Sequence, residues 1–291
     1  MKNICIIGNL GMLGAQLESV FREDEAYDVV GWDKEEIDIT DASRAREKII
    51  ACKPDIIINA AAYNNVDKAE TDDKELAMKI NGEAVETLAK IANELGALLV
   101  QYSSDYVFAG DKKIGYTEIN EPSPISVYGE SKLAGEEAAR SARAYYLLRT
   151  SRLFGASASS AGAKKSFVDI MLSLAKDKKE FDLVDEEFAS PTYVVDLARR
   201  TKEIIEAEEP YGLYHVTNSG ACTWYGFGAE IFRLARLKNV VTRPVPVSAF
   251  PRPAKRPAYS ELVSMKLRPL RPWQDALKEY IEPMVIDKKY I

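Results

Sequence analysis

Short apolar runs alternate with amphipathic stretches along the first half of the chain. The apolar runs are rich in β-branched residues and have the length of strands, at residues 4–8, 28–33, 55–59, 97–103 and 145–151. The stretches between them space their apolar positions as a helix does, notably at 11–22, 41–52, 72–94 and 127–142. This alternation predicts an α/β fold with a doubly wound parallel sheet and helices on both faces.

The alternation becomes less regular after residue 151. A Ser/Ala/Gly stretch at 155–163 predicts a flexible loop, and residues 165–177 and 191–207 predict two more helices. Residues 212–217 predict a strand, whereas the proline-dense segment 245–262 cannot form a regular helix. We therefore expect a main domain at 1–151, which residues 190–217 rejoin, and a smaller C-terminal domain that occupies most of 152–291.

Composition and charge exclude several function classes. The 291 residues carry 39 basic and 45 acidic side chains, a net charge of −6, so no broad basic field is available for nucleic acid. Three cysteines without CxxC spacing argue against a disulfide framework or a zinc site and fit a reducing compartment. Since no apolar run reaches the length of a signal-peptide core or a membrane span, we expect a cytoplasmic protein that does not bind membranes.

His215 is the only histidine. A histidine-rich metal site therefore cannot be built, and a Ser-His-Asp hydrolase would have to use this one residue. Because His215 lies in the alternating segment GLYHVTN, we predict a structural histidine in a half-buried strand, and we identify no metal site.

Three glycines separate the first predicted strand from the first predicted helix. They lie in GNLGMLG as Gly8, Gly11 and Gly14. Glycines allow a tight strand-to-helix turn, and the N–H groups at the start of the helix, at Met12 and Leu13, favour a diphosphate. The GxxGxxG spacing is one residue longer than the commonest dinucleotide fingerprint, but its place in the first βα unit predicts a Rossmann-type NAD(P)-binding domain.

An acidic residue ends the second predicted strand, where a carboxylate typically binds the adenosine ribose. This residue is Asp33, and it favours NADH, although the neighbouring Lys34 leaves NADPH open. Asp38 and Ile39 are candidate neighbours of the adenine, with a surface acid an almost equal alternative for Asp38. Small residues after the third strand leave room for the cofactor, namely Ala60, Ala61 and Ala62.

A tyrosine and a lysine four residues apart form the sharpest candidate for catalysis. On a helix, Tyr128 and Lys132 would lie on one face about 6 Å apart along the axis. A lysine ammonium beside a phenol favours the phenolate, so we expect a lowered tyrosine pKa and an efficient proton donor and acceptor. Ser104, at the end of the fourth predicted strand, could hydrogen-bond a reacting carbonyl. The spacing alone also occurs by chance, and the order of these features strengthens the prediction.

Taken together, these motifs resemble the extended short-chain dehydrogenase/reductase superfamily and, within it, the dTDP-4-dehydrorhamnose reductases. The resemblance covers nearly the whole chain and also rests on the stretches SSDYVFAG (103–110), YGESKLAGE (128–136), LRTSRLFG (148–155), FASPTYVVDLA (188–198), GLYHVTNSG (212–220) and KRPAYSEL (255–262). It implies an NADH- or NADPH-dependent reductase of a 4-keto-6-deoxy nucleotide-sugar, with a nucleotide-sugar as substrate and a possible homodimer.

The resemblance also implies roles for individual residues. Ser104, Tyr128 and Lys132 would form the catalytic triad, with Lys132 also binding the nicotinamide ribose. Ser103 and Asn81 would support the cofactor site or the proton relay. Candidate substrate contacts are Asp105, Tyr106, Phe108, Arg152, Arg256 and Tyr259.

Two positions depart from the pattern of that family. Ser104 stands where threonine is usual, which keeps the hydroxyl. Arg152 stands where an aromatic residue is usual and replaces stacking by charge, so either the pocket is rearranged or the sugar differs.

Two other functions are compatible with these motifs. A nucleotide-sugar 4-epimerase shares the glycine motif and the Tyr-Lys pair, while a dehydratase is disfavoured because Tyr106 follows Asp105 where a second acid would be needed. A catalytically silent NAD(P)-binding subunit, resembling the regulatory chain of methionine adenosyltransferase, is the alternative from another class.

Overall fold

The computed structural model describes residues 1–156 and 165–286, and the predicted loop at 155–163 lies largely outside them. Six strands form one parallel sheet in the order β2-β1-β3-β4-β5-β9. Their bounds are β1 Lys2–Ile7, β2 Tyr27–Trp32, β3 Ile56–Asn59, β4 Leu98–Ser104, β5 Tyr145–Thr150 and β9 Gly212–His215. This is the doubly wound parallel sheet that the sequence predicts, and the fold class is confirmed.

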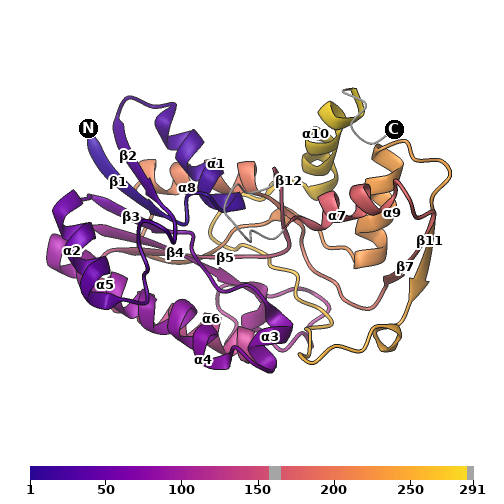
Figure 1. Cartoon of the computed structure of the whole chain (residues 1–291), viewed down its shortest axis with the longest axis horizontal. Coiled ribbons are helices and arrows are strands. Elements are labelled where there is room, and N and C mark those ends of the chain that lie inside the picture. The colour runs from indigo at the N-terminus through magenta and orange to yellow at the C-terminus, as the bar shows by residue number, and fades with distance from the viewer. Residues whose placement is uncertain (157–164, 287–291) are drawn as a thin grey trace.

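Helices cover both faces of this sheet (Figure 1). On one face, α1 (Met12–Arg22) and α8 (Val194–Glu206) bury apolar side chains against the strands. On the other face, α2 (Ala42–Cys52), α5 (Ala84–Leu95) and α6 (Val127–Ala139) do the same. Because parallel strands end at a common edge, the loops that follow β1, β3, β4 and β5 meet there, where ligands bind in open sheets of this kind.

A second apolar core lies beside the sheet, on the right of Figure 1. Its helices are α7 (Phe167–Leu174), α9 (Trp224–Leu234) and α10 (Trp273–Ile286), together with the parallel pair β7 (Glu180–Val184) and β11 (Val241–Val245). Short parallel pairs join this part to the main sheet: β6 (Leu153–Phe154) with β8 (Thr192–Tyr193), and β10 (Asn218–Ser219) with β12 (Leu270–Pro272). The chain at 250–262 follows the short η3 turn (Val247–Ala249) and passes between the two parts without forming a helix or a strand.

The stretch predicted as one helix at 72–94 is divided. It forms α4 (Lys74–Met78), one π-helical turn η1 (Lys79–Glu83) and α5, and it is preceded by α3 (Val66–Glu70), which was not predicted. The π turn directs Asn81 inward, where its side chain bonds both backbone polar groups of Tyr63. Insertions of this kind commonly mark functional positions, and here the turn lies beside α6.

A buried ion pair connects α6 with β5. The Arg149 guanidinium donates to both carboxylate oxygens of Glu136, at 2.7 and 2.6 Å, and neither side chain has any exposed surface. The Ser103 hydroxyl donates to the same carboxylate at 2.6 Å, and the guanidinium lies 4.8 Å from the centre of the Phe108 ring. Since every partner is hydrogen-bonded, the pair fixes α6 against the sheet.

His215, at the end of β9, is buried and joins three segments. Its Nδ1 lies 3.1 Å from the Tyr116 carbonyl and 3.2 Å from the Val263 carbonyl, so Nδ1 carries the proton. Its backbone N–H donates to Glu118, which also accepts from Ser264. Burial lowers the pKa of His215 to about 4, an effect that outweighs the opposing attraction of Glu118.

This lowered pKa predicts an acid-sensitive fold. Between pH 6.5 and about 4 the unfolded chain protonates its histidine while the folded chain does not, so the unfolded state binds more protons. The contribution of His215 is therefore complete above pH 6.5 and decreases by roughly 2–3 kcal/mol as the pH falls towards 4. Denaturant unfolding of the protein and of His215→Asn across this range checks it. Parallel pH profiles for the two proteins would contradict the assignment.

No helix within residues 1–156 and 165–286 combines the length and apolar character that crossing a membrane requires. The same residues contain no cluster of histidine, cysteine or acidic side chains arranged to hold a metal ion.

Candidate active site

The glycine turn between β1 and α1 is shaped to receive a diphosphate. A Cβ at Gly14 would lie 2.0 Å from the carbonyl oxygen of Gly8, so the turn can close this tightly only with glycine at that position. Gly11 is the N-cap of α1 and provides no side chain to cap the helix, and Met12 and Leu13 present the first N–H groups. These features fit the diphosphate of NAD(P)H, which α1 would bind through its N–H groups and its dipole.

The acidic residues after β2 are partly engaged within their own loop. Asp33 accepts from the N–H of Lys34, and Asp38 accepts from both the N–H and the hydroxyl of Thr40, which lowers the pKa of Asp38. Ile39 is buried among apolar side chains. Asp33 stays the candidate for the adenosine ribose, and Asp38 and Ile39 stay predicted neighbours of the adenine.

The alanines after β3 adjoin the glycine turn. The N–H of Ala60 donates to the carbonyl of Ile7, and a Cβ at Gly8 would lie 2.8 Å from the Ala61 nitrogen. Ala62 follows directly in the same extended segment. Their small side chains lie beside the glycine turn, and the room that we expect them to leave for the cofactor stays a prediction.

The three predicted catalytic side chains lie near the end of β4. Ser104 is the last residue of β4; its hydroxyl donates to Asp105 and lies close enough to the Tyr128 phenol to lower the pKa of that phenol. Ser126 caps α6 by accepting from the Gly129 N–H, which places Tyr128 in the first turn and Lys132 one turn later. All three side chains are buried.

The charge relation between Tyr128 and Lys132 differs from the sequence prediction. The Lys132 ammonium donates to the Tyr102 carbonyl at 2.8 Å, and burial lowers its pKa to about 8 while Glu136 opposes the shift. Burial raises the pKa of Tyr128, and among its neighbours only the Ser104 hydroxyl lowers it. The expected depression of the Tyr128 pKa by Lys132 is therefore wrong for this structure, because desolvation dominates and Lys132 is not among the groups that lower it.

Asn81 and Ser103 support the site from behind. The Asn81 amide donates to the Ser131 hydroxyl at 2.9 Å, which in turn donates to the Tyr128 carbonyl at 2.7 Å. A Cβ at Gly135 would lie 2.1 Å from the Asn81 carbonyl, so α6 packs directly on the π turn. Ser103 points to Glu136, on the opposite face of the sheet from Ser104, and its side chain is not placed to contact a cofactor.

Of the residues that follow Ser104, Asp105 and Tyr106 lie beside the catalytic residues, whereas Phe108 lies in the core. Asp105 is buried and accepts from Ser260 at 2.6 Å, and burial raises its pKa while Ser260 and Arg152 oppose the shift. Tyr106 contacts Tyr128 edge to face, with ring centres 5.4 Å apart. Phe108 has no exposed surface and stacks on Tyr116, so the prediction that it faces the substrate is wrong; it belongs to the core.

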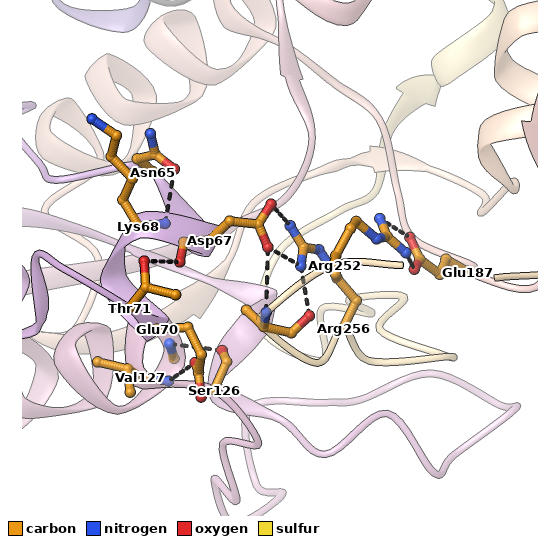
Figure 2. A network of polar contacts seen from close by, with 12 residues as sticks. Asn65, Asp67, Lys68, Glu70, Thr71, Ser126, Val127, Glu187, Arg252 and Arg256 are labelled. Atoms are coloured by element: carbon orange, nitrogen blue, oxygen red, sulfur yellow. Dashed lines mark hydrogen bonds and ion pairs between the residues drawn. The ribbon is translucent and has the colours of Figure 1, made fainter. Parts of the chain in front are cut away.

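Arg256 and Tyr259 lie on the segment that crosses between the two parts of the molecule. Arg256 donates to both oxygens of Asp67 in α3, each at 2.7 Å, and to the Ala254 carbonyl (Figure 2). The Tyr259 ring stacks on Phe188 at 5.3 Å. Arg256 therefore ties the substrate side of the site to α3 rather than pointing freely into it.

Comparison with known proteins identifies the family. A family profile described as the RmlD substrate binding domain matches residues 1–286. The dTDP-4-dehydrorhamnose reductase of Escherichia coli K12 is 35% identical over 97% of this chain and 98% of its own. The crystal structure of dTDP-4-dehydrorhamnose reductase from Bacillus anthracis in complex with NADP is 35% identical, with a TM-score of 0.91 over 97% of this chain and 99% of that chain.

The chain belongs to this family. Membership confirms the resemblance stated from the sequence and makes the protein an NAD(P)H-dependent oxidoreductase by descent. A further relative, named a probable dTDP-4,6-dihydroxy-2-methyloxan-3-one 4-ketoreductase from Streptomyces antibioticus, is 37% identical over 94% of this chain and 92% of its own. The family thus contains proteins named for more than one keto sugar.

Within this reductase family site, the structure adds residues that the sequence did not indicate. Glu187 is buried and accepts from the indole N–H of Trp224 and from Arg252. Glu70, at the end of α3, accepts from the N–H of Val127 at the start of α6 (Figure 2). Glu187, Trp224 and Arg252 are far apart in the sequence and form no motif there, so only the fold shows that they lie together.

Proposed function

We propose that the protein is an NADH- or NADPH-dependent reductase that converts the 4-keto group of a dTDP-linked 4-keto-6-deoxyhexose, dTDP-4-dehydrorhamnose, into an alcohol. The observation that carries this proposal is the convergence of Ser104, Tyr128 and Lys132 at the end of β4, on the edge where the glycine turn offers a diphosphate site.

In this mechanism the Ser104 hydroxyl and the Tyr128 phenol hydrogen-bond the keto oxygen of the sugar. When bound, NAD(P)H supplies the hydride that the keto carbon gains. Tyr128 gives its proton to the oxygen as negative charge develops there, so the product is a neutral alcohol. The buried phenol suits this direction of reaction, because its raised pKa keeps it protonated at neutral pH.

Lys132 has two roles in the same mechanism. Its ammonium, fixed by the Tyr102 carbonyl, has two further N–H groups for the hydroxyls of the nicotinamide ribose. Its positive charge also stabilises the phenolate left after proton transfer. With a pKa of about 8, the lysine is largely charged at neutral pH.

The test is the purified protein with NADH or NADPH and dTDP-4-dehydrorhamnose. We expect equivalent amounts of reduced nicotinamide and keto sugar to disappear, with a dTDP-6-deoxyhexose as product by mass and NMR. Interconversion of sugar isomers without net nicotinamide consumption would instead indicate an epimerase. Cofactor binding without turnover would indicate a regulatory subunit.

The proposal also includes a homodimer and a cytoplasmic location. The described cysteines Cys5, Cys52 and Cys222 are free, which fits a reducing compartment. Light scattering of the purified protein tests the dimer.

A further inference from the structure

Asp105 is a buried carboxylate that lies between two serine hydroxyls. It begins the short turn η2 (Asp105–Val107) directly after β4, and only 3% of its surface is exposed. The Ser104 hydroxyl donates to its Oδ1 at 3.1 Å, and the Ser260 hydroxyl donates to its Oδ2 at 2.6 Å. Both partners are neutral, and the mechanism proposed above gives this carboxylate no task. A buried ionisable group beside a catalytic residue is a candidate for a role in the reaction.

Arg152 is the basic side chain that acts on Asp105. It lies between β5 and β6, and its guanidinium donates to the Cys222 carbonyl at 2.8 Å and to the Glu187 carbonyl at 2.7 Å. Its positive charge attracts Asp105 and opposes proton uptake, yet in the described part of the chain it forms no ion pair with that carboxylate. Hydroxyl partners stabilise a buried carboxylate less than a paired cation does, so burial remains the stronger influence.

Two phenols also face Asp105, those of Tyr106 in η2 and Tyr128 in α6. Burial raises the pKa of Tyr106 to about 12 and also raises that of Tyr128, so both phenols are neutral at neutral pH. Burial likewise raises the pKa of Asp105 above its ordinary value. Asp105 therefore binds a proton more readily than an exposed carboxylate does.

The single hydroxyl proton of Ser104 cannot serve two acceptors. The Tyr106 N–H donates to the Ser104 oxygen at 3.2 Å, and the Ser104 proton goes to Asp105. When this proton turns to the keto oxygen of the substrate, the Ser104 oxygen and Asp105 Oδ1 face each other as two acceptors at the same 3.1 Å. Two facing acceptors repel each other, and the contact becomes favourable again only when a proton lies between them.

We propose that Asp105 binds a proton when the keto sugar arrives and donates it in a hydrogen bond to Ser104, so that Ser104 can donate to the keto oxygen. Ser260 holds Asp105 in position for this role. The proton comes from the solvent, and the carboxylate becomes a neutral acid without any other bond forming or breaking. The change also removes a negative charge from the place where the keto oxygen becomes negative. Asp105 and Ser260 are positioning residues, because they act through Ser104, and the inference rests on the proposed function.

The experiment measures proton uptake when the keto sugar binds. The wild type and Asp105→Asn, each saturated with NAD⁺, which cannot supply a hydride, are titrated calorimetrically with dTDP-4-dehydrorhamnose in two buffers of different ionisation enthalpy. The asparagine amide can donate to Ser104 while its carbonyl accepts from Ser260, but it binds no proton. We expect the wild type to take up about one proton per site near neutral pH and Asp105→Asn to take up none.

The affinity for the keto sugar should show the same proton. Because the complex holds a proton that the free protein lacks, the dissociation constant should rise with pH, by up to about tenfold per unit, in the wild type and stay constant in Asp105→Asn. Asp105→Leu, which cannot donate, should lower kcat about tenfold to a hundredfold, whereas Asp105→Asn should stay within about threefold of the wild type at neutral pH. Parallel pH profiles for the wild type and Asp105→Asn would overturn the proposal.

Ser260→Ala tests the second hydroxyl. Removal of this donor destabilises the carboxylate, so the pKa of Asp105 rises further and the pH dependence of sugar binding should move to higher pH. Ser264→Ala is the matched control, since Ser264 also donates to a buried carboxylate at 2.6 Å, that of Glu118, which otherwise accepts from backbone N–H groups. The same shift in both variants would contradict the role of Ser260.

The possible outcomes separate this inference from the proposed function. A wild type that reduces the sugar while Asp105→Asn takes up the same number of protons refutes the inference and leaves the proposed function standing. A wild type that binds the sugar with proton uptake but never reduces it refutes the proposed function alone.

Discussion

Replacing Tyr128 with phenylalanine is expected to lower kcat about a hundredfold to ten-thousandfold, the usual contribution of a positioned proton donor. Only the phenolic oxygen is removed, so the ring still packs against Tyr106 and the helix start is unchanged. Steady-state rates with a keto sugar and NADH, together with NADH binding by fluorescence, measure the effect. The dissociation constant for NADH should change by less than about threefold, because the substitution removes one neutral hydroxyl and no charge from the cofactor site.

Tyr214→Phe is the matched control for this substitution. Tyr214 is also a buried tyrosine, and its hydroxyl donates to the Pro210 carbonyl, far along the chain from the site. We expect its kcat to equal that of the wild type. Turnover by Tyr128→Phe at the same rate as Tyr214→Phe would exclude Tyr128 as the proton donor.

Glu136→Gln is expected to lower the free energy of unfolding by about 3–5 kcal/mol. The substitution leaves the Arg149 guanidinium charged, fully buried and without an opposite charge, which is the costly way to break such a pair. Glu94→Gln is the matched control, because the Arg46–Glu94 pair has 56% and 46% of its side-chain surface exposed and should contribute less than about 1 kcal/mol. Urea unfolding of the three proteins measures both changes, and similar values for the two variants would refute the role of the buried pair.

The sequence predicts the main sheet because each strand is a local apolar run that needs no knowledge of its partners. The short helix α3 was missed since five residues are too few for a periodic pattern, and its only signal is the cap at Asn65. The π turn was missed for a different reason. It depends on contacts of Asn81 with Tyr63 and Ser131, 18 and 50 residues away, which no local pattern contains.

In the candidate site, too, local motifs could be predicted and contacts between distant segments could not. Ser104, Tyr128 and Lys132 could be named because a motif and its place in a βα repeat point to them, and their roles stay predictions until they are tested. The partners of Arg152 could not be named, because Glu187 and Cys222 lie 35 and 70 residues away. Ser103 is an error that the sequence could have prevented, since successive strand residues point to opposite faces.

The direct packing of Gly135 on the Asn81 carbonyl has a consequence for how this protein can vary. No side chain of any size fits between these two backbones, so the spacing of α6 from the π turn is set by bare main chain. Tyr128 and Lys132 belong to the same helix, α6. A larger residue at position 135 would therefore move both side chains away from Ser104. The geometry of the catalytic residues therefore requires glycine at a position that lies outside the catalytic triad.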